Sequence, residues 1–394
     1  MKFHNSGPRA RGPIKSSGVR PINKRKQPSF SDISKFVNKA VITEDVAVYV
    51  PEHKFNDFTL EQLLKDNISK KGYITPTPIQ DRAIPHLLRG EDIVGVANTG
   101  TGKTAAFLIP LINKILVAKS ERALVVAPTR ELAFQIDEEL RAFAKSSGLY
   151  STLLIGGVNI HKQIMELRHK PHFVIGTPGR IKDHIESGSL DLSAFRSVVL
   201  DEADRMLDMG FIRDMRFMMA KMSKDRHTIF FSATLSKEIE GLIDEFLKSP
   251  ARISVKTRDT AKNIDQDIIR IQGKNKYQIL LDLLRQEEFG KVLVFSRTKY
   301  GAEKLAKNLK LDAIKAESIH GNKNQVARQR ALSDFKRDEA KVLVATDVAA
   351  RGLDISDISH VINYDLPATY EDYIHRIGRT GRAEKKGKAL TFIE

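Results

Sequence analysis

Residues 93–110 read I-V-G-V-A-N-T-G-T-G-K-T-A-A-F-L-I-P, which is an apolar run, a glycine-rich turn and a second apolar segment. The first run predicts a buried strand, and the apolar residues from about Ala105 predict a helix. This arrangement is typical of a P-loop, in which Gly100 and Gly102 let backbone N–H groups approach phosphates. Lys103 would supply charge to the β and γ oxygens, and the Thr104 hydroxyl would bind Mg²⁺. The strand-to-helix context disfavours the alternative, a glycine turn without a ligand.

Similar apolar runs recur along the chain and predict parallel sheets. They are continuous rather than alternating, which indicates strands buried on both faces. We expect an α/β domain at residues 51–250 and another at 264–394, each a doubly wound or RecA-like, mostly parallel sheet flanked by helices, joined by a polar linker at 251–263. The expected strands are Ile93–Val96, Ala123–Val126, Phe173–Ile175, Val198–Leu200 and Thr228–Phe231, then Lys291–Phe295, Lys341–Ala345, Val361–Tyr364 and the run Ala389–Glu394.

Polar motifs begin where these strands end, and ligands of open parallel sheets bind beyond the carboxyl ends of strands. D-E-A-D follows the run at 198–200, so Asp201 would hold Mg²⁺ and Glu202 would orient and deprotonate a water. An acidic helix start is the alternative. The segment H-R-I-G-R-T-G-R at 375–382 offers arginines that could reach a γ-phosphate from the second domain, or form only a basic surface helix. In the first case, domain closure would complete the site.

Composition points to a polyanionic partner. Lys and Arg number 65 against 49 Asp and Glu, a formal charge of +16, which favours nucleic acid ahead of an anionic membrane. The absence of cysteine excludes disulfides and thiolate chemistry.

Residues 1–31 hold eight Lys or Arg and no acid, which predicts a disordered basic tail, with a transit peptide as the alternative. A short docking helix is expected within 33–40, completing an N-terminal region at 1–50. No stretch has membrane-spanning length, so we expect a cytoplasmic monomer with no membrane partner.

The ordered motifs resemble those of the DEAD-box RNA helicases of superfamily 2. They are G-Y-I-T-P-T-P-I-Q (72–80), A-N-T-G-T-G-K-T (97–104), P-T-R-E-L-A (128–133), G-G (156–157), T-P-G-R (177–180), D-E-A-D (201–204), S-A-T (232–234), A-T-D-V-A-A-R-G-L-D (345–354) and H-R-I-G-R-T-G-R (375–382). The resemblance runs from about Phe55 to the C-terminus. It implies an RNA-dependent ATPase that locally unwinds or remodels short duplexes, with ATP and Mg²⁺ as cofactors and RNA as a sequence-tolerant partner.

The resemblance also assigns roles by position. Gln80 would recognise the adenine edge and Phe55 would stack on its face, while Asp354 would contact the ribose. Ser232, Thr234 and Asp204 would couple hydrolysis to closure, with His375 nearby. Catalysis would rest on Lys103, Asp201, Glu202, His375, Arg379 and Arg382, and the nucleotide site would also include Tyr73, Thr75, Thr99, Gly100, Thr101, Gly102 and Thr104. The RNA backbone would contact Pro128, Arg130, Gly157, Thr177, Gly179 and Arg180 on the first domain, and Arg297, Gly321, Gln325, Arg328 and Thr346 on the second.

Two departures from the family pattern and two other functions remain open. Asn98 stands where the family more often has Gln, and we expect little effect on hydrolysis. The family sequence usually continues through another helix beyond the strand-like run at 389–394. An ATP-locked RNA clamp or annealing chaperone is the first alternative function. A DNA motor is the second.

Overall fold

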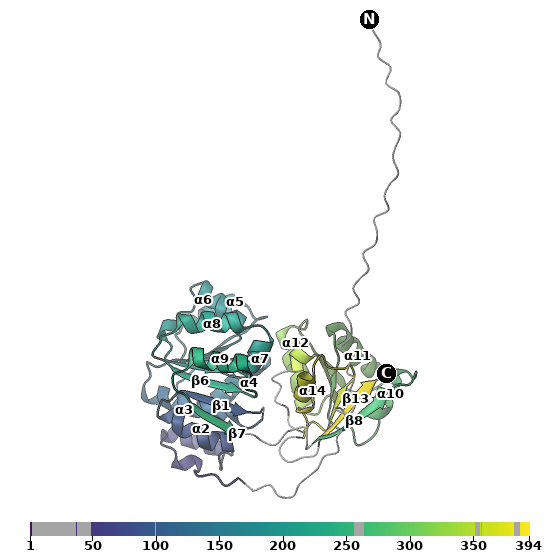
Figure 1. Cartoon of the computed structure of the whole chain (residues 1–394), viewed down its shortest axis with the longest axis horizontal. Helices are drawn as coiled ribbons and strands as arrows, with labels where there is room; N and C mark the ends of the chain where they lie inside the picture. Colours follow the sequence, from purple (N-terminus) through teal and green to yellow (C-terminus); the bar gives the residue numbers. More distant parts are fainter. Residues whose placement is uncertain are drawn as a thin grey trace. The chain divides into compact units, whose positions relative to one another are not determined.

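The computed structural model describes residues 1, 37, 49–98, 100–255, 264–350, 355, 357–381 and 387–394. The expected basic tail, the short helix expected within 33–40 and most of the expected linker lie outside these ranges. So do three expected site residues, Thr99, Asp354 and Arg382. The described residues form two α/β domains, each built on its own sheet (Figure 1).

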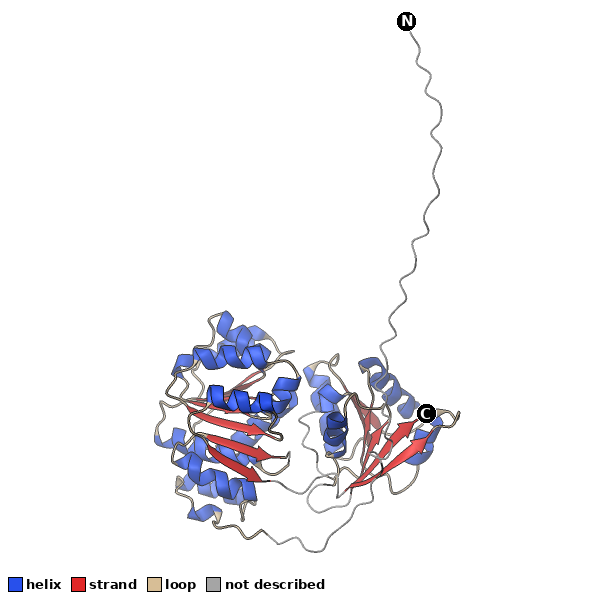
Figure 2. Cartoon of the chain, in the orientation of Figure 1, coloured by secondary structure: helices blue, strands red, loops and turns tan. Residues whose placement is uncertain are grey.

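The first domain is a seven-stranded sheet in the order β3-β4-β2-β5-β6-β1-β7, with every pair parallel. Helices cover both of its faces (Figure 2). Its strands are β1 Ile93–Ala97, β2 Ala123–Val126, β3 Ser151–Leu154, β4 Phe173–Gly176, β5 Ser197–Leu200, β6 His227–Ser232 and β7 Ala251–Val255. Its helices are η2 Phe55–Asp57, α1 Gln62–Lys70, α2 Pro78–Leu88, α3 Lys103–Val117, α4 Arg130–Phe143, α5 Ile160–Arg168, α6 Pro178–Glu186, η3 Leu192–Ala194, α7 Ala203–Asp208, α8 Ile212–Lys221 and α9 Lys237–Phe246.

Successive residues of the central strands enter opposite hydrophobic cores, as the period of a strand requires. Ile93 and Val125 pack with α1 to α4 on one face. Val94 and Val126 pack with α6 to α9 on the other. Both faces are therefore apolar, which explains the continuous hydrophobic runs in the sequence.

The second domain is a six-stranded parallel sheet in the order β10-β11-β9-β12-β13-β8. Again two separate cores lie on its two faces. Its strands are β8 Ile264–Arg270, β9 Val292–Phe295, β10 Ala316–Ile319, β11 Val342–Ala345, β12 His360–Asn363 and β13 Gly387–Ile393. Its helices are α10 Lys276–Leu284, α11 Lys299–Leu311, α12 Gln325–Lys336, α13 Asp347–Ala350 and α14 Tyr370–Ile377. The expected class, two parallel sheets flanked by helices, is confirmed.

One boundary expected from the sequence is wrong. Residues 251–255 were expected to open the linker, but they form β7 and pair in register with all of β1, from Ile93↔Ala251 to Ala97↔Val255. The run A-R-I-S-V alternates polar and apolar residues because β7 is an edge strand with one face exposed. The linker therefore starts after Val255.

His360, at the start of β12, gives the second domain a pH-dependent stability. The ring is buried and stacked on Phe289, with centroids 4.0 Å apart, and burial lowers its pKa to about 4. An unfolded histidine titrates near 6.5, so the folded state binds fewer protons between these two values. Stability is therefore fully present above about pH 6.5 and is lost as the pH falls toward 4.

We expect the free energy of unfolding to fall by about 1 to 2 kcal/mol between pH 7 and pH 5 through His360 alone. A His360→Asn variant, which cannot titrate, should show a correspondingly weaker pH dependence. Urea unfolding of both proteins at the two pH values measures the difference, and the other titrating groups cancel in it. Identical pH dependences would contradict the assignment.

Candidate active site and nucleic-acid interface

The strand order of the first domain brings the expected nucleotide residues together. β5, β6 and β1 are neighbours, and their carboxyl ends lead into D-E-A-D, S-A-T and the P-loop respectively. The remaining half of the sheet, β3-β4-β2, leads into G-G, T-P-G-R and P-T-R. One edge of the sheet therefore carries two adjacent groups of polar motifs, one suited to phosphates of a nucleotide and one to a polynucleotide backbone.

The P-loop backbone has the conformation that its glycines predict. Gly100 and Gly102 have φ values of +86° and +90°, in the left-handed region that favours glycine. A Cβ on Gly102 would lie 2.4 Å from the Gln80 side-chain nitrogen, so a larger residue would have to displace Gln80 in addition to the strain of the positive φ. Lys103 is buried, and its Nζ donates to the backbone oxygen of Ala97 at 3.0 Å. The Lys103 side chain therefore folds back across the P-loop to the end of β1.

Gln80 connects the helix before the P-loop to the P-loop itself. Its side-chain oxygen accepts from the Thr77 N–H at 2.9 Å, which caps α2, and its side-chain nitrogen donates to the Gly102 oxygen at 3.1 Å. The Thr77 hydroxyl also donates to the Thr101 oxygen at 2.8 Å. The side chain of Gln80, which is expected to recognise adenine, is therefore held by two hydrogen bonds, one of them to the loop that would hold the phosphates.

The other expected base contacts lie near this helix. The Phe55 ring is buried edge-on against Tyr73, with centroids 5.7 Å apart, and Thr75 is exposed. Because so little of Phe55 reaches the surface, its role in stacking on adenine stays a prediction. Asn98, the departure from the family pattern, accepts a hydrogen bond on its backbone oxygen from the Thr101 hydroxyl at 2.8 Å.

The acidic motif after β5 is a buried cluster in a strained turn. Asp201 and Glu202 are both nearly inaccessible, and Glu202 has φ +51° and ψ +51°, a left-handed conformation unusual outside glycine. The Glu202 N–H donates to Asp201 Oδ1 at 2.9 Å. Glu202 Oε2 lies 2.9 Å from Nη1 of Arg205, an equally buried partner on the next helix turn. This ion pair fixes the direction of the Glu202 carboxylate.

Burial raises the pKa of Asp201, the neighbouring charge of Glu202 acts in the same direction, and the charge of Lys103 opposes them. A buried carboxylate with a raised pKa gains from a nearby cation. The Thr104 hydroxyl and the Asp201 carboxylate are oxygen donors of the kind that Mg²⁺ prefers, with water completing its shell. The residues present therefore fit a Mg²⁺ ion. Within the described ranges no cluster of three or more acidic or histidine side chains offers a second metal site.

Asp204 links the acidic motif to the end of β6. Its Oδ2 accepts hydrogen bonds from the Ala233 N–H at 3.0 Å, the Thr234 N–H at 3.1 Å and the Thr234 hydroxyl at 3.3 Å. The Ser232 hydroxyl donates to the Thr234 oxygen at 2.7 Å. These hydrogen bonds join the end of β6 to α7, and the role of this turn in coupling hydrolysis to closure stays a prediction.

The expected RNA contacts of the first domain surround a close turn after β3. The Arg130 guanidinium lies against this turn so tightly that a Cβ on Gly157 would sit 2.5 Å from Nη1. Desolvation there lowers the pKa of Arg130. Arg180 donates to the Val158 oxygen on the same loop at 3.1 Å and to Gln163 Oε1 on α5 at 2.9 Å. Thr177 and Gly179 begin α6 and are partly exposed, whereas Pro128 is buried.

The expected RNA contacts of the second domain follow β10, β11 and β9, which are also neighbours in their sheet. Arg297 and Gly321 are exposed, and Thr346 is buried at the end of β11. Gln325 and Arg328 on α12 are buried. Within the described residues neither side-chain polar atom of Gln325 has a hydrogen-bond partner. A buried amide without partners is costly, so a polar ligand would stabilise it.

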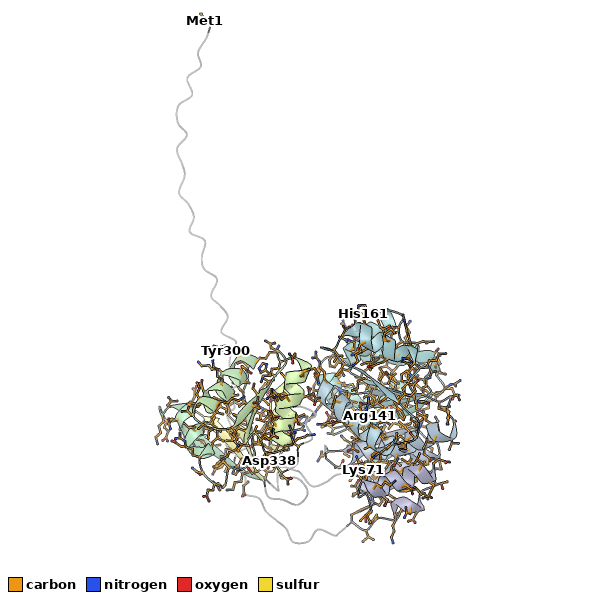
Figure 3. The ribbon with its side chains drawn as sticks, turned by 180° about the vertical axis from the view of Figure 1, so that it is seen from behind. Met1, Lys71, Arg141, His161, Tyr300 and Asp338 are labelled. Carbon is orange, nitrogen blue, oxygen red and sulfur yellow. The ribbon has the colours of Figure 1, made fainter. Side chains whose placement is uncertain are left out.

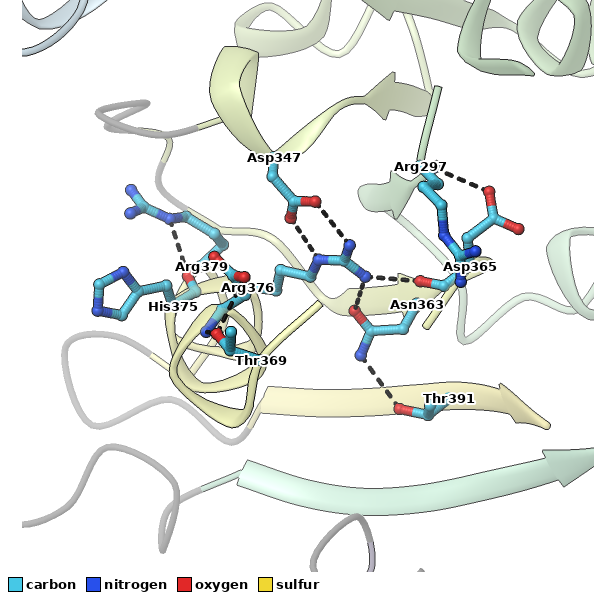
Figure 4. Close-up of polar contacts among 10 residues, drawn as sticks. Arg297, Asp347, Asn363, Asp365, Thr369, His375, Arg376, Arg379 and Thr391 are labelled. Carbon is cyan, nitrogen blue, oxygen red and sulfur yellow. Dashed lines mark hydrogen bonds and ion pairs between the residues drawn. The ribbon is translucent and has the colours of Figure 1, made fainter. Parts of the chain in front are cut away.

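The arginines of the last motif have different surroundings (Figure 4). Arg376 points into the domain and pairs with both oxygens of Asp347, at 2.5 and 2.8 Å, and it also donates to Asn363 at 3.1 Å and to the Asp365 oxygen at 2.7 Å. Arg379 points the other way, and its Nε donates to the His375 oxygen at 3.3 Å. Arg376 is therefore part of the scaffold. Arg379 is also buried, and its role at the γ-phosphate stays a prediction.

Sequence reasoning missed the residues that hold these groups in place. Arg205 orients Glu202, and Asp347 with Asn363 orients Arg376. Asp365 accepts from the Ser296 hydroxyl and the Arg297 N–H at 3.0 and 2.8 Å, fixing the loop after β9. One signal was available for Arg205, because a charge three residues after Glu202 on a helix predicts an ion pair. The contacts of Asp347 and Asp365 join segments distant in sequence, so no local spacing reveals them.

Comparisons with known proteins agree with this arrangement. Residues 77–242 match the family model described as DEAD/DEAH box helicase, and residues 275–384 match the one described as helicase conserved C-terminal domain. The DEAD-box ATP-dependent RNA helicase CshA of Bacillus cereus is 45% identical over 86% of this chain and 65% of its own length. CshA of Geobacillus kaustophilus is 45% identical over 86% of this chain and 73% of its own length. The chain thus spans just under two thirds of the Bacillus cereus protein.

Solved structures extend the likeness to the fold. The DEAD-box helicase Mss116 bound to ssRNA and UDP-BeF is 29% identical, with a TM-score of 0.78 over 87% of this chain and 76% of that one. Dbp5 of S. cerevisiae bound to RNA and ADP BeF3 is 29% identical, with a TM-score of 0.75 over 86% of this chain and 89% of that one. The RecA-like architecture expected for both domains is confirmed.

Proposed function

The chain belongs to the DEAD-box family of helicases, and from this premise we propose that it is an RNA-dependent ATPase that locally unwinds or remodels short RNA duplexes. One observation carries the proposal. Lys103, Asp201 and Glu202 are buried beyond the carboxyl ends of β1 and β5. The motifs G-G, T-P-G-R and P-T-R follow the carboxyl ends of β3, β4 and β2 in the same sheet. ATP hydrolysis and binding of an RNA strand can therefore take place at the carboxyl ends of one sheet.

In this proposal Glu202 accepts the proton of the attacking water while its ion pair with Arg205 keeps the carboxylate in position. Lys103 leaves the Ala97 oxygen and moves to the β and γ phosphates, where it offsets developing charge. Mg²⁺, held by Thr104 and Asp201, would supply further charge neutralisation. Gln80 selects adenine while it holds α2 on the P-loop.

We also propose that the two domains close when ATP and RNA are bound. Arg379 and Arg382 would then contribute to the nucleotide site from the second domain. Asp204 would couple the positions of the Asp201 and Glu202 carboxylates to the S-A-T turn through its hydrogen bonds. Closure would bend one RNA strand out of A-form geometry, and hydrolysis would reset the open state. Backbone amides, hydroxyls and arginines recognise phosphate and 2′-OH groups, so binding should tolerate different sequences.

The part of the chain that the structure describes contains no helix long and apolar enough to span a bilayer. The monomeric state, the cytoplasmic location and the domain limits at 51–250 and 264–394, apart from the corrected linker start, stay predictions.

The test is phosphate release with and without single-stranded RNA, combined with displacement of a short labelled strand. We expect RNA to stimulate hydrolysis and displacement to require ATP. Stimulation without displacement would favour the ATP-locked clamp instead. Equal stimulation by DNA and RNA of one length would favour a DNA motor, and no stimulation by either would contradict the proposal.

A further inference from the structure

Helix α11 of the second domain presents an exposed aromatic and basic surface. Tyr300, Lys304 and Lys307 are spaced at i, i+4 and i+7, so they share one face of the helix. All three are exposed, and Tyr300 is 79% exposed, although a large aromatic ring normally gains from burial. Figure 3 shows Tyr300 at the margin of its domain. These three residues are called the α11 face below.

The lysines of the α11 face have uncompensated charges. The acid on this helix, Glu303, is engaged by the Ser318 hydroxyl at 2.5 Å, by His320 at 2.9 Å and by Lys323 at 3.5 Å. These contacts hold the pKa of Glu303 at about 2. Across the described ranges neither Lys304 nor Lys307 forms an ion pair. The α11 face is therefore a local concentration of positive charge, which attracts a polyanion.

The α11 face begins beside residues that the proposed function assigns to RNA. Arg297 lies in the loop after β9, and Thr298 caps the helix by accepting from the Gly301 N–H at 2.9 Å. A Cβ on Gly301 would lie 2.8 Å from both the Ser296 and Thr298 hydroxyls, so the first turn of α11 is packed closely onto this loop. The Lys299 side chain lies near Gly321, because a Cβ there would contact Lys299 Cε at 3.4 Å. Tyr300 therefore belongs to a helix turn that is packed onto the loop carrying Arg297, and its neighbour Lys299 lies near Gly321.

We propose that the α11 face binds single-stranded RNA, with Tyr300 stacking on a base and Lys304 and Lys307 contacting the following phosphates. A rise of about 1.5 Å per residue puts Lys304 about 6 Å along the helix from Tyr300 and Lys307 about 4.5 Å further. An exposed aromatic ring beside a row of cations is the combination that binds single strands without reading sequence. The proposal rests on the RNA-dependent function above and extends the RNA path beyond the sheet edge.

The chain contains no tryptophan, which permits a direct test. A Tyr300→Trp variant places a single indole on the α11 face. A Val117→Trp variant provides a control away from the α11 face, because Val117 ends α3 of the first domain and is 69% exposed, close to the value for Tyr300. Both full-length variants are titrated with oligouridine RNA in the presence of Mg²⁺ and a non-hydrolysable ATP analogue, and indole emission is recorded. We expect RNA to quench the emission of the indole at 300 and to leave that at 117 nearly unchanged.

RNA-stimulated phosphate release is measured on the same two preparations and on the unsubstituted protein. Stimulation without quenching at 300, or with equal quenching at both positions, would overturn the α11 proposal and leave the helicase proposal intact. Loss of stimulation in the unsubstituted protein would instead contradict the helicase proposal.

Affinity measurements separate stacking from a general charge effect. Tyr300→Ala should weaken oligouridine binding about 5-fold or more, whereas Tyr300→Phe should retain most of it, since stacking needs only the ring. Replacing Lys304 and Lys307 together by Gln should reduce the slope of log affinity against log salt by about 1.4, the value for two phosphates of a single strand. An unchanged slope, or equal losses in Tyr300→Ala and Tyr300→Phe, would contradict the proposed contacts.

Discussion

Replacing Glu202 by Gln should reduce RNA-stimulated phosphate release by about 10² to 10⁴-fold while ATP still binds. The amide keeps the size of the carboxylate but cannot accept the proton of the attacking water. It also loses the charged contact with Arg205. Phosphate release at saturating ATP and RNA measures the effect.

Asp208→Asn is a suitable control for this variant. Asp208 ends α7, the short helix that begins immediately after Glu202, but its side chain is exposed. The control should keep nearly all of the stimulated rate, and ATP affinity should change little in either variant. A Glu202→Gln rate within about threefold of the unsubstituted protein would exclude Glu202 as the general base.

Two arginines of one motif should give opposite phenotypes. Arg379→Ala should lower RNA-stimulated hydrolysis by about 10³-fold or more, the loss expected for an arginine that reaches the γ-phosphate, and it should destabilise the domain less than Arg376→Ala does. Arg376→Ala should destabilise the second domain by about 3 to 5 kcal/mol, because it leaves Asp347 without its bidentate partner.

Heat denaturation and phosphate release on both variants decide this prediction. An Arg376→Lys variant keeps a charge for Asp347 but cannot form the bidentate contact, so its stability should fall between the unsubstituted protein and Arg376→Ala. The assignment fails if Arg379→Ala is the less stable of the two alanine variants, or if Arg376→Ala unfolds at the temperature of the unsubstituted protein.

The sequence predicted the inner strands well and the edge strands poorly. The strands expected from continuous apolar runs, such as Val198–Leu200, all lie inside their sheets. The strands that were missed, β3, β7, β8 and β10, are the four outermost strands of the two sheets. An edge strand such as β7 leaves much of one face exposed, so its pattern does not differ enough from that of a polar loop.

The candidate site shows a similar division. Motifs that bind ligands through backbone and strand ends, such as the P-loop, could be predicted because their spacing is local. The partners that orient the catalytic groups could be predicted only where they lie on the same helix, as Arg205 does. The contact of Arg376 with Asn363 and the three donors to Asp204 depend on which strands are neighbours, and an isolated motif does not contain that information.

The strand order of the first domain separates the residues that would set substrate preference from those that would hydrolyse ATP. The residues proposed to hydrolyse ATP follow β5, β6 and β1, whereas those proposed to hold the polynucleotide follow β3, β4 and β2. In register the two halves meet at β2 and β5, where the Asp201 N–H donates to the Val126 oxygen at 3.0 Å. Substrate preference can therefore be altered by substitutions after three strands while the chemistry after the other three stays constant. Evolution or protein design can therefore change the polynucleotide that is bound and keep the residues proposed to hydrolyse ATP.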